Sequence, residues 1–198
     1  MKIGLFGGTF DPIHKAHIAL ADAAVKEVGL DELYFMPAYV SPFKIGVKTE
    51  SGDHRYNMIH EILHYNDAFR VSSYELLKQD VSYTFDTLTH LKKVFQCDIY
   101  FILGYDSLVQ LDTWYKGDQL LSEFPIVAGK RPGTKSDLAA SKIKEYQEEY
   151  NADIRVLEMA EMDIAATDIR ECITQNEPIS DYVVPEVEEY IIDNKLYQ

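Results

Sequence analysis

Short apolar runs alternate along the chain with longer stretches that are apolar on one face only. The runs predict buried strands at residues 2–6, 33–36, 69–72, 98–103, 125–128 and 154–157. The longer stretches predict helices, one or two of them around Trp114 in 107–121 and the others at 16–28, 54–65, 84–95, 137–150, 167–174 and 185–192. Alternation of this kind is typical of a parallel sheet with helices on both faces.

We therefore expect an α/β fold, a Rossmann-like doubly wound parallel sheet with a small C-terminal helical extension. Residues 1–198 should form a single domain that includes 164–198, because the chain shows no linker, repeat or low-complexity segment. Such sheets bind ligands beyond the carboxyl ends of their strands, near the point where strand order reverses. Two turns follow predicted strands and should lie at that edge, Gly7-Gly8 and Gly104-Tyr105-Asp106.

Composition narrows the classes of function. The 198 residues carry a formal net charge of −14, which argues against a nucleic-acid-binding surface. No apolar run approaches the roughly 18 residues that a membrane helix needs, and the first residues do not form a signal peptide. Cys97 and Cys172 belong to no Cys-x-x-Cys pair, so we expect buried or incidental thiols in a reducing cytoplasm. The sequence leaves open whether the chain forms a homo-oligomer.

Segment 7–17 reads Gly-Gly-Thr-Phe-Asp-Pro-Ile-His-Lys-Ala-His and places His14, Lys15 and His17 at the start of the first predicted helix. A helix start carries partial positive charge, so three potential cations there favour a bound anion such as phosphate. His14 and His17 are three positions apart, so both imidazoles should lie on one helix face and could hold two neighbouring phosphates. The two preceding glycines would form a turn and let the backbone approach a ligand closely.

Two alternatives for segment 7–17 stay open. One is an ordinary polar helix start after an Asp11-Pro12 turn, which leaves the placement of the cations unexplained. The other is a zinc site on His14 and His17, for which no further ligand stands at an obvious spacing.

A further cation lies at a predicted helix start near the C-terminus. Thr167 suits an N-cap, and Arg170 follows three positions later, where a capping box would have Glu or Gln. A planar guanidinium matches two phosphate oxygens, so Arg170 is a second candidate phosphate ligand. The alternative is a surface arginine paired with Asp168 or Glu171.

Motifs over nearly the whole chain resemble those of nucleotidyltransferases, in particular bacterial nicotinate-nucleotide adenylyltransferases. They appear in the family's order, at 7–17, at 82–88 (SYTFDTL), at 104–106 followed by Trp114, at 164–170 (IAATDIR) and at 184–191 (VPEVEEYI). The resemblance implies an enzyme of NAD biosynthesis that transfers the adenylyl group of ATP to nicotinate mononucleotide, with Mg²⁺ accompanying ATP. It implies small-molecule partners only, without nucleic acid or membrane.

The resemblance also implies the site residues. Catalytic roles fall to His14, His17 and Arg170, with His17 at the α-phosphate, and no protein ligand for the metal is expected. The ATP site would comprise Gly7, Gly8, Thr9, Phe10, His14, His17, Lys44, Gly104, Asp106, Thr167 and Arg170.

For the mononucleotide, the resemblance implies that Trp114 stacks on the nicotinate ring and that backbone N–H groups around Thr84 and Tyr115 bind its carboxylate. Without the resemblance, a core position for Trp114, the only tryptophan, would be favoured. A large aromatic ring commonly packs in the core of a protein.

This chain departs from the family pattern at Ala165 and Ala166, where two serines are usual, at Phe43, where histidine is usual, and at Ala16, where glycine is usual. Two possible hydroxyl contacts near the phosphates are therefore absent, but His14, His17, Lys44, Thr167 and Arg170 remain, so we expect activity to survive. Ala165 and Ala166 suggest one alternative, a nucleotide-binding protein without catalysis. The other alternative is the same chemistry on another acceptor, such as nicotinamide mononucleotide, phosphopantetheine or a phosphorylated alcohol.

Overall fold

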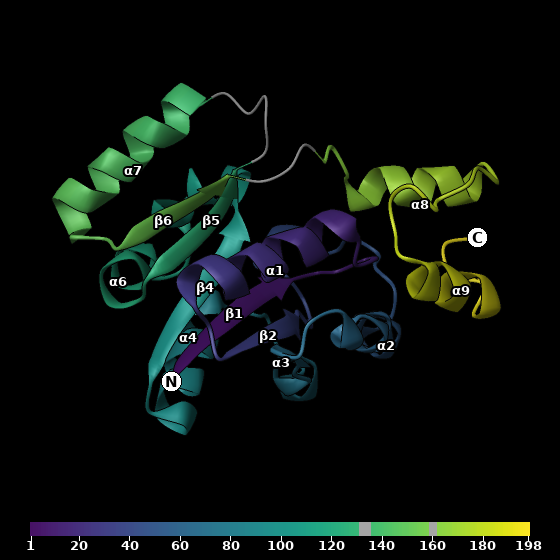
Figure 1. Cartoon of the computed structure of the whole chain (residues 1–198), viewed down its shortest axis with the longest axis horizontal. Helices are drawn as coiled ribbons and strands as arrows, with labels where there is room; N and C mark the ends of the chain where they lie inside the picture. The colour runs from purple at the N-terminus through teal and green to yellow at the C-terminus, as the bar shows by residue number, and fades with distance from the viewer. Residues whose placement is uncertain (131–135, 159–161) are drawn as a thin grey trace.

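The computed structural model describes residues 1–130, 136–158 and 162–198, and it confirms the expected α/β fold. Six parallel strands form one sheet in the order β3-β2-β1-β4-β5-β6 (Figure 1). Strand order reverses between the two central strands, β1 and β4. The strands are β1 (Lys2–Gly8), β2 (Glu32–Pro37), β3 (Phe69–Val71), β4 (Asp98–Gly104), β5 (Ile126–Lys130) and β6 (Ile154–Glu158).

Helices cover both faces of the sheet, and the described ones are too short or too polar to cross a membrane. The α-helices are α1 (Lys15–Val28), α2 (Gly52–Glu61), α3 (Tyr74–Lys78), α4 (Thr84–Phe95), α5 (Tyr105–Leu108), α6 (Gly117–Glu123), α7 (Ser136–Tyr150), α8 (Ala166–Thr174) and α9 (Pro185–Asp193). The described residues also include the short 3₁₀ turns η1 (Pro42–Lys44), η2 (Leu63–Tyr65) and η3 (Leu111–Thr113), of which η3 joins α5 to α6.

The core consists of two apolar layers, one on each face of the sheet. Alternate residues of β4 enter different layers: Ile102 packs with α1, α2, α8 and α9, whereas Phe101 packs with α4 to α7. Both side chains are almost fully buried. Because helices cover both faces, the central strands are apolar at successive positions, which is why the sequence shows them as continuous runs.

Some helix boundaries differ from the predicted ones, because the helices are very short or because a capping hydrogen bond sets where they begin. The stretch 107–121 divides into α5, η3 and α6, and α3 was not predicted because five residues are too few for a helical period. Helix α2 begins earlier than expected, since Ser51 accepts a hydrogen bond from the His54 N–H at 3.2 Å as its N-cap. Cys97 and Cys172 are free thiols, and both are half-buried.

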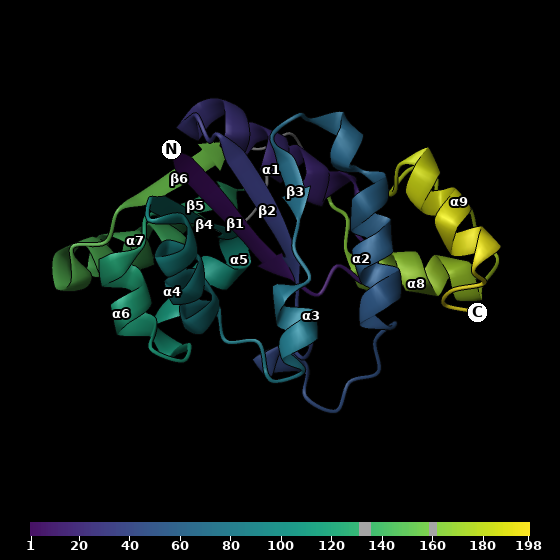
Figure 2. The ribbon, with the colours of Figure 1, turned by 90° about the horizontal axis from the view of Figure 1, so that it is seen from below.

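The C-terminal helices α8 and α9 lie beside α2 at one end of the sheet (Figures 1 and 2). The Tyr190 hydroxyl on α9 bonds with His54 Nδ1 and Asn57 Nδ2 on α2, each at 3.0 Å. Val187 and Ile191, on the same helix, are buried in the core layer that α2 shares. The last segment of the chain therefore packs against elements from its first third.

One glycine fixes the segment that carries Trp114. A Cβ atom on Gly117 would lie 2.2 Å from the main-chain oxygen of Leu111 and 2.9 Å from that of Asp112, so α6 and η3 are in direct backbone contact. The Gly117 N–H also donates to the Trp114 carbonyl at 2.9 Å.

Gly117→Ala should therefore lower the free energy of unfolding by about 1–3 kcal/mol, because the new methyl group meets backbone that cannot move aside. Urea unfolding of the purified variant measures this. Gly104→Ala is the matched control, since its Cβ would meet nothing within 4 Å and its φ is −73°. A Gly117→Ala variant as stable as the control would contradict this packing.

Candidate active site

Two adjoining cavities open at the carboxyl ends of β1 and β4, where the strand order reverses. Their volumes are about 300 and 280 Å³. Gly7, Thr84, Ser107 and Trp114 line both cavities and therefore mark the boundary between them. A doubly wound sheet is expected to bind its ligands at this place.

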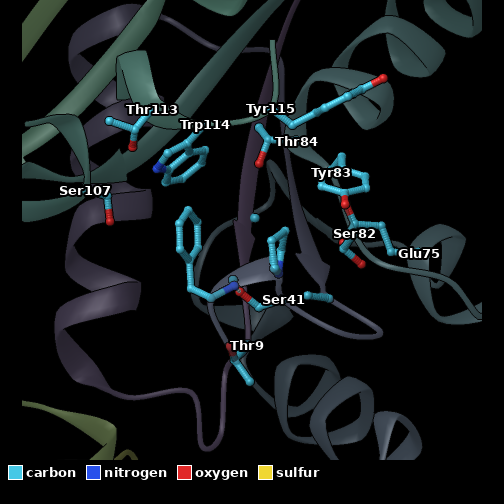
Figure 3. Close-up of a pocket in the computed structure, with 15 residues that line it drawn as sticks. Thr9, Ser41, Glu75, Ser82, Tyr83, Thr84, Ser107, Thr113, Trp114 and Tyr115 are labelled. Carbon is cyan, nitrogen blue, oxygen red and sulfur yellow. Dashed lines mark hydrogen bonds between the residues drawn. The ribbon is translucent and has the colours of Figure 1, made fainter. Parts of the chain in front are cut away.

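The larger space, which we call the α4-side cavity, lies between α4 and the loop that follows β2. Figure 3 shows Trp114, Thr84 and Tyr115 on one side of it, with Ser41 and Thr9 opposite. Helix α4 begins at Thr84, and its N-cap Tyr83 makes no side-chain capping bond. Because the first N–H groups of a helix have no intrahelical partner, this end of α4 suits an anionic group.

Trp114 occupies the boundary between the two cavities. Its ring lies 6.1 Å from the buried ring of Phe101 and 5.2 Å from that of Phe43, measured between centroids. The side chain is only partly buried. Trp114 thus packs on the core with one part and lines both cavities with another.

Glu75 also lines the α4-side cavity, and the sequence offered no signal for it, because it lies on the unpredicted α3. The residue is 6% exposed, and its carboxylate accepts a hydrogen bond of 2.5 Å from Thr87 Oγ1 on α4. Burial raises the pKa of this carboxyl above its ordinary value. Glu75 therefore ties α3 to the helix whose N-terminus faces the cavity.

The second space, the α1-side cavity, is lined by His17, Gly104 and Asp106, together with Ala16, Leu20, Gly129 and others. Gly104 ends β4 and is the N-cap of α5, and Asp106 follows in that helix. The structure thus brings these two sequence-predicted residues together with His17.

His14 and His17 lie against each other, although His14 is the N-cap of α1 and only His17 lies within the helix. Their rings are stacked 3.6 Å apart with 21° between the planes. His14 is the extended N-cap of α1, and His17 Nδ1 accepts a hydrogen bond from the His14 N–H at 3.3 Å. Since Nδ1 is the acceptor, this contact assigns the proton of a neutral His17 ring to Nε2. His17 can then offer an N–H donor to a ligand in the α1-side cavity.

The turn expected at Gly7-Gly8 is wrong. Both residues are the last of β1, paired with β2, and the chain turns only afterwards, at Phe10 with φ 51°. A Cβ on Gly7 would meet nothing within 4 Å, so the bare backbone borders both cavities directly. Phe10 is 2% exposed and lines neither cavity; its ring packs edge-on against His17 at 5.1 Å.

Thr167 is not the N-cap of α8, contrary to the sequence expectation. The N-cap is Ala165, whose extended backbone starts the helix without a side-chain bond, so Thr167 is the second helical residue and Arg170 lies beyond the first turn. The Thr167 hydroxyl instead accepts a hydrogen bond from Arg170 Nη2 at 3.3 Å. Arg170 Nη1 donates to the main-chain oxygens of Asp11, at 2.6 Å, and Ala166, at 3.1 Å.

These bonds hold Arg170 at the loop between β1 and α1. Its guanidinium bonds Asp11, Ala166 and Thr167, so the alternative of a surface pair with Asp168 or Glu171 is wrong. Neither Arg170 nor Thr167 lines the two cavities, and the same holds for Lys44 and His14.

A group of cations surrounds Asp11. The pKa of Lys44 lies below its ordinary value, because its ammonium loses hydration and because Arg170 and Arg55 add positive charge nearby, which Asp11 partly offsets. Arg55, 2% exposed, donates to the main-chain oxygens of Thr9 at 2.8 Å and of Glu50 at 3.0 Å. Arg55 lies in no motif of the sequence, so its place in this group was not predicted. Lys44, Arg55 and Arg170 outnumber the nearby carboxylates of Asp11 and Glu50, and an excess of positive charge favours an additional anion.

The described residues include no group of three or more His, Cys, Asp and Glu side chains that could hold a metal ion. The zinc alternative for His14 and His17 therefore has no further ligand in that part of the chain.

Comparisons with known proteins agree with this geometry. The model of the cytidylyltransferase-like family matches residues 5–172. A probable nicotinate-nucleotide adenylyltransferase of Carboxydothermus hydrogenoformans is 38% identical over 199 residues, with 100% of this chain and 98% of the relative covered. The nicotinate-nucleotide adenylyltransferase of Bacillus subtilis is 34% identical, with the same coverage.

Among solved structures, Plasmodium falciparum nicotinic acid mononucleotide adenylyltransferase complexed with NaAD superposes with a TM-score of 0.83. The two chains are 23% identical, and 99% of this chain and 97% of that one are covered, which supports the fold. The full-length matches at more than 30% identity decide the family: this chain belongs to the nicotinate-nucleotide adenylyltransferases, nucleotidyltransferases with a cytidylyltransferase-like domain.

Proposed function

We propose that this enzyme transfers the adenylyl group of ATP to nicotinate mononucleotide, giving nicotinate adenine dinucleotide and pyrophosphate in NAD biosynthesis. The observation that carries the proposal is the pair of adjoining cavities that share Trp114 and Thr84, next to the cations around Asp11. Two spaces that meet at one boundary suit two substrates that must be joined. The names of the relatives supply the identity of the substrates.

In this proposal, the α4-side cavity takes nicotinate mononucleotide. Trp114 stacks on the pyridine ring, and the N–H groups at Thr84 and Tyr115 bind its carboxylate. The α1-side cavity takes the adenosine part of ATP, with Gly104 and Asp106 near the ribose. This assignment places the reacting phosphates at the shared boundary, beside Gly7.

The reaction needs no side-chain nucleophile. An oxygen of the mononucleotide phosphate attacks the α-phosphorus of ATP and forms a new P–O bond, while the bond to the bridging oxygen of pyrophosphate breaks. His17 donates from Nε2 to an α-phosphate oxygen as charge develops there, and His14, Lys44 and Arg170 hold the leaving phosphates. Catalysis then rests on positioning and fixed positive charge. Gly8, Thr9, Phe10 and Thr167 shape the same site.

Nucleotidyltransferases generally use a divalent metal ion with ATP, and we propose Mg²⁺. This ion takes substrate phosphate oxygens and water and needs few protein ligands. The residues fit such an arrangement, because the described residues include no group of three or more His, Cys, Asp and Glu side chains that would hold an ion by themselves. When bound, Mg²⁺ would neutralise part of the phosphate charge.

We further propose that residues 1–198 act as one nucleotidyltransferase domain, with 164–198 as its helical part. The contacts of Arg170 and Tyr197 with Asp11 support this, because they join the last segment to the motif that opens the chain.

Pyrophosphate release tests the proposed function. Purified enzyme with ATP should release pyrophosphate with nicotinate mononucleotide and far less with nicotinamide mononucleotide or phosphopantetheine. Preference for another acceptor would assign the same chemistry to a different substrate. ATP binding without pyrophosphate release from any acceptor would instead identify a non-catalytic nucleotide-binding protein.

His17→Ala should lower kcat by about 10²–10³-fold, the effect of removing one donor at a developing oxyanion. His17→Gln should keep part of the rate, because its amide N–H can approach the position of Nε2–H. Steady-state pyrophosphate release measures both. His60→Ala is the control, since His60 is exposed at the end of α2. Near-normal turnover of His17→Ala would exclude the assigned role.

Trp114→Ala should chiefly raise KM for nicotinate mononucleotide, by about 10-fold, since stacking on a flat ring contributes roughly 1–3 kcal/mol. Trp114→Phe should recover part of this loss. Initial rates at saturating ATP give the constant. An unchanged KM in Trp114→Ala would show that Trp114 only packs on the core and does not bind the substrate.

A further inference from the structure

The last residues of the chain reach the loop that carries the N-terminal motif. The Tyr197 hydroxyl donates to Asp11 Oδ1 at 2.9 Å, across 186 positions of sequence. Leu196 anchors this tail: its side chain is 3% exposed, and its N–H donates to the Ile191 carbonyl on α9 at 3.0 Å. Tyr197 itself is partly buried. The hydroxyl is therefore presented by a fixed segment and not by a frayed end.

Asp11 is the point where three separate parts of the chain meet. It is 3% exposed, and Oδ1 also accepts from the Glu50 N–H at 3.2 Å. Its main-chain oxygen accepts from Arg170 at 2.6 Å. Three residues further along the chain, His14 caps α1. A rotation of the Asp11 side chain or a shift of its backbone would therefore move two proposed phosphate ligands, Arg170 and His14.

The Tyr197 hydroxyl is the donor of its hydrogen bond with Asp11. Burial, followed by the negative charge and hydrogen bond of Asp11, raises the pKa of this phenol far above its ordinary value. The raised pKa keeps the proton on the tyrosine hydroxyl. Without that donor, only the Glu50 N–H would hold Asp11 Oδ1, and the carboxylate could turn more easily toward Lys44 or Arg170, the cations proposed to bind the nucleotide.

We propose that Tyr197 is a positioning residue of the adenylyltransferase: its hydroxyl fixes the Asp11 carboxylate and, through Asp11, the places of Arg170 and the start of α1. The inference rests on the proposed function for the identity of the reaction. It concerns the nucleotide side of the site only, because Tyr197 lines neither cavity and makes no contact with Trp114 or Thr84 among the hydrogen bonds of the described residues.

Tyr197→Phe tests this directly, because it keeps the ring and removes only the hydroxyl. We expect kcat/KM for ATP to fall about tenfold, the loss of one hydrogen bond to a charged group, with KM for nicotinate mononucleotide unchanged. Tyr190→Phe is the matched control: it removes a hydroxyl from the neighbouring helix α9, which bonds His54 and Asn57 instead of Asp11. This control should keep the wild-type constants for both substrates.

Coupling to Asp11 gives a second, independent measurement. In an Asp11→Ala background, Tyr197→Phe should change kcat/KM for ATP by less than about twofold, because the acceptor is already gone. Melting temperatures confirm that each variant is folded at the assay temperature. The proposal is overturned if Tyr197→Phe leaves the ATP constants unchanged, if it affects both substrates equally, or if its effect is additive with Asp11→Ala.

Titration calorimetry of ATP alone separates this inference from the proposed function. If the wild-type enzyme releases no pyrophosphate with nicotinate mononucleotide, the proposed function fails. Weaker ATP binding by Tyr197→Phe, with normal binding by Tyr190→Phe, would still support the positioning role. Equal ATP binding by all three proteins would overturn the positioning role, whatever the acceptor.

Discussion

The hydrogen bond from the Arg170 guanidinium to the main-chain carbonyl of Asp11, 2.6 Å long, joins parts of the chain that are 159 positions apart. Because His14 begins the next helix three residues after Asp11, the same bond relates the C-terminal cation to the paired histidines. Several cations must be held at fixed distances if they are to act together on one polyphosphate. This constraint supports the enzyme's proposed phosphate site.

The sheet provides the other constraint. Reversal of strand order between β1 and β4 leaves their carboxyl ends adjacent with helices diverging from them, and the two cavities lie there. Gly7, next to the end of β1, and Gly104, at the end of β4, have no side chains that could fill the space. Trp114 lines both cavities, and the close contact of Gly117 with η3 holds the segment that carries it.

Much of the fold was predictable, because helices bury both faces of the sheet and the strands therefore appear as apolar runs. Helix α3 was not predictable in this way, since five residues show no period. The end of β1 and the N-cap of α8 were not predictable from local sequence rules either. Gly7 and Gly8 continue β1 because β2 pairs with them, and Ala165 caps α8 while the Thr167 hydroxyl bonds Arg170.

The sequence by itself determined the alternation of strands and helices, the concentration of His14, His17 and Arg170 near helix starts in an acidic chain, and the family resemblance of its motifs. Only the tertiary structure decided that Arg55 holds the motif loop and that Tyr197 reaches Asp11. These contacts join residues far apart in the chain, and their strength depends on burial and geometry. Local spacing and residue type do not predict which distant residue a side chain will contact.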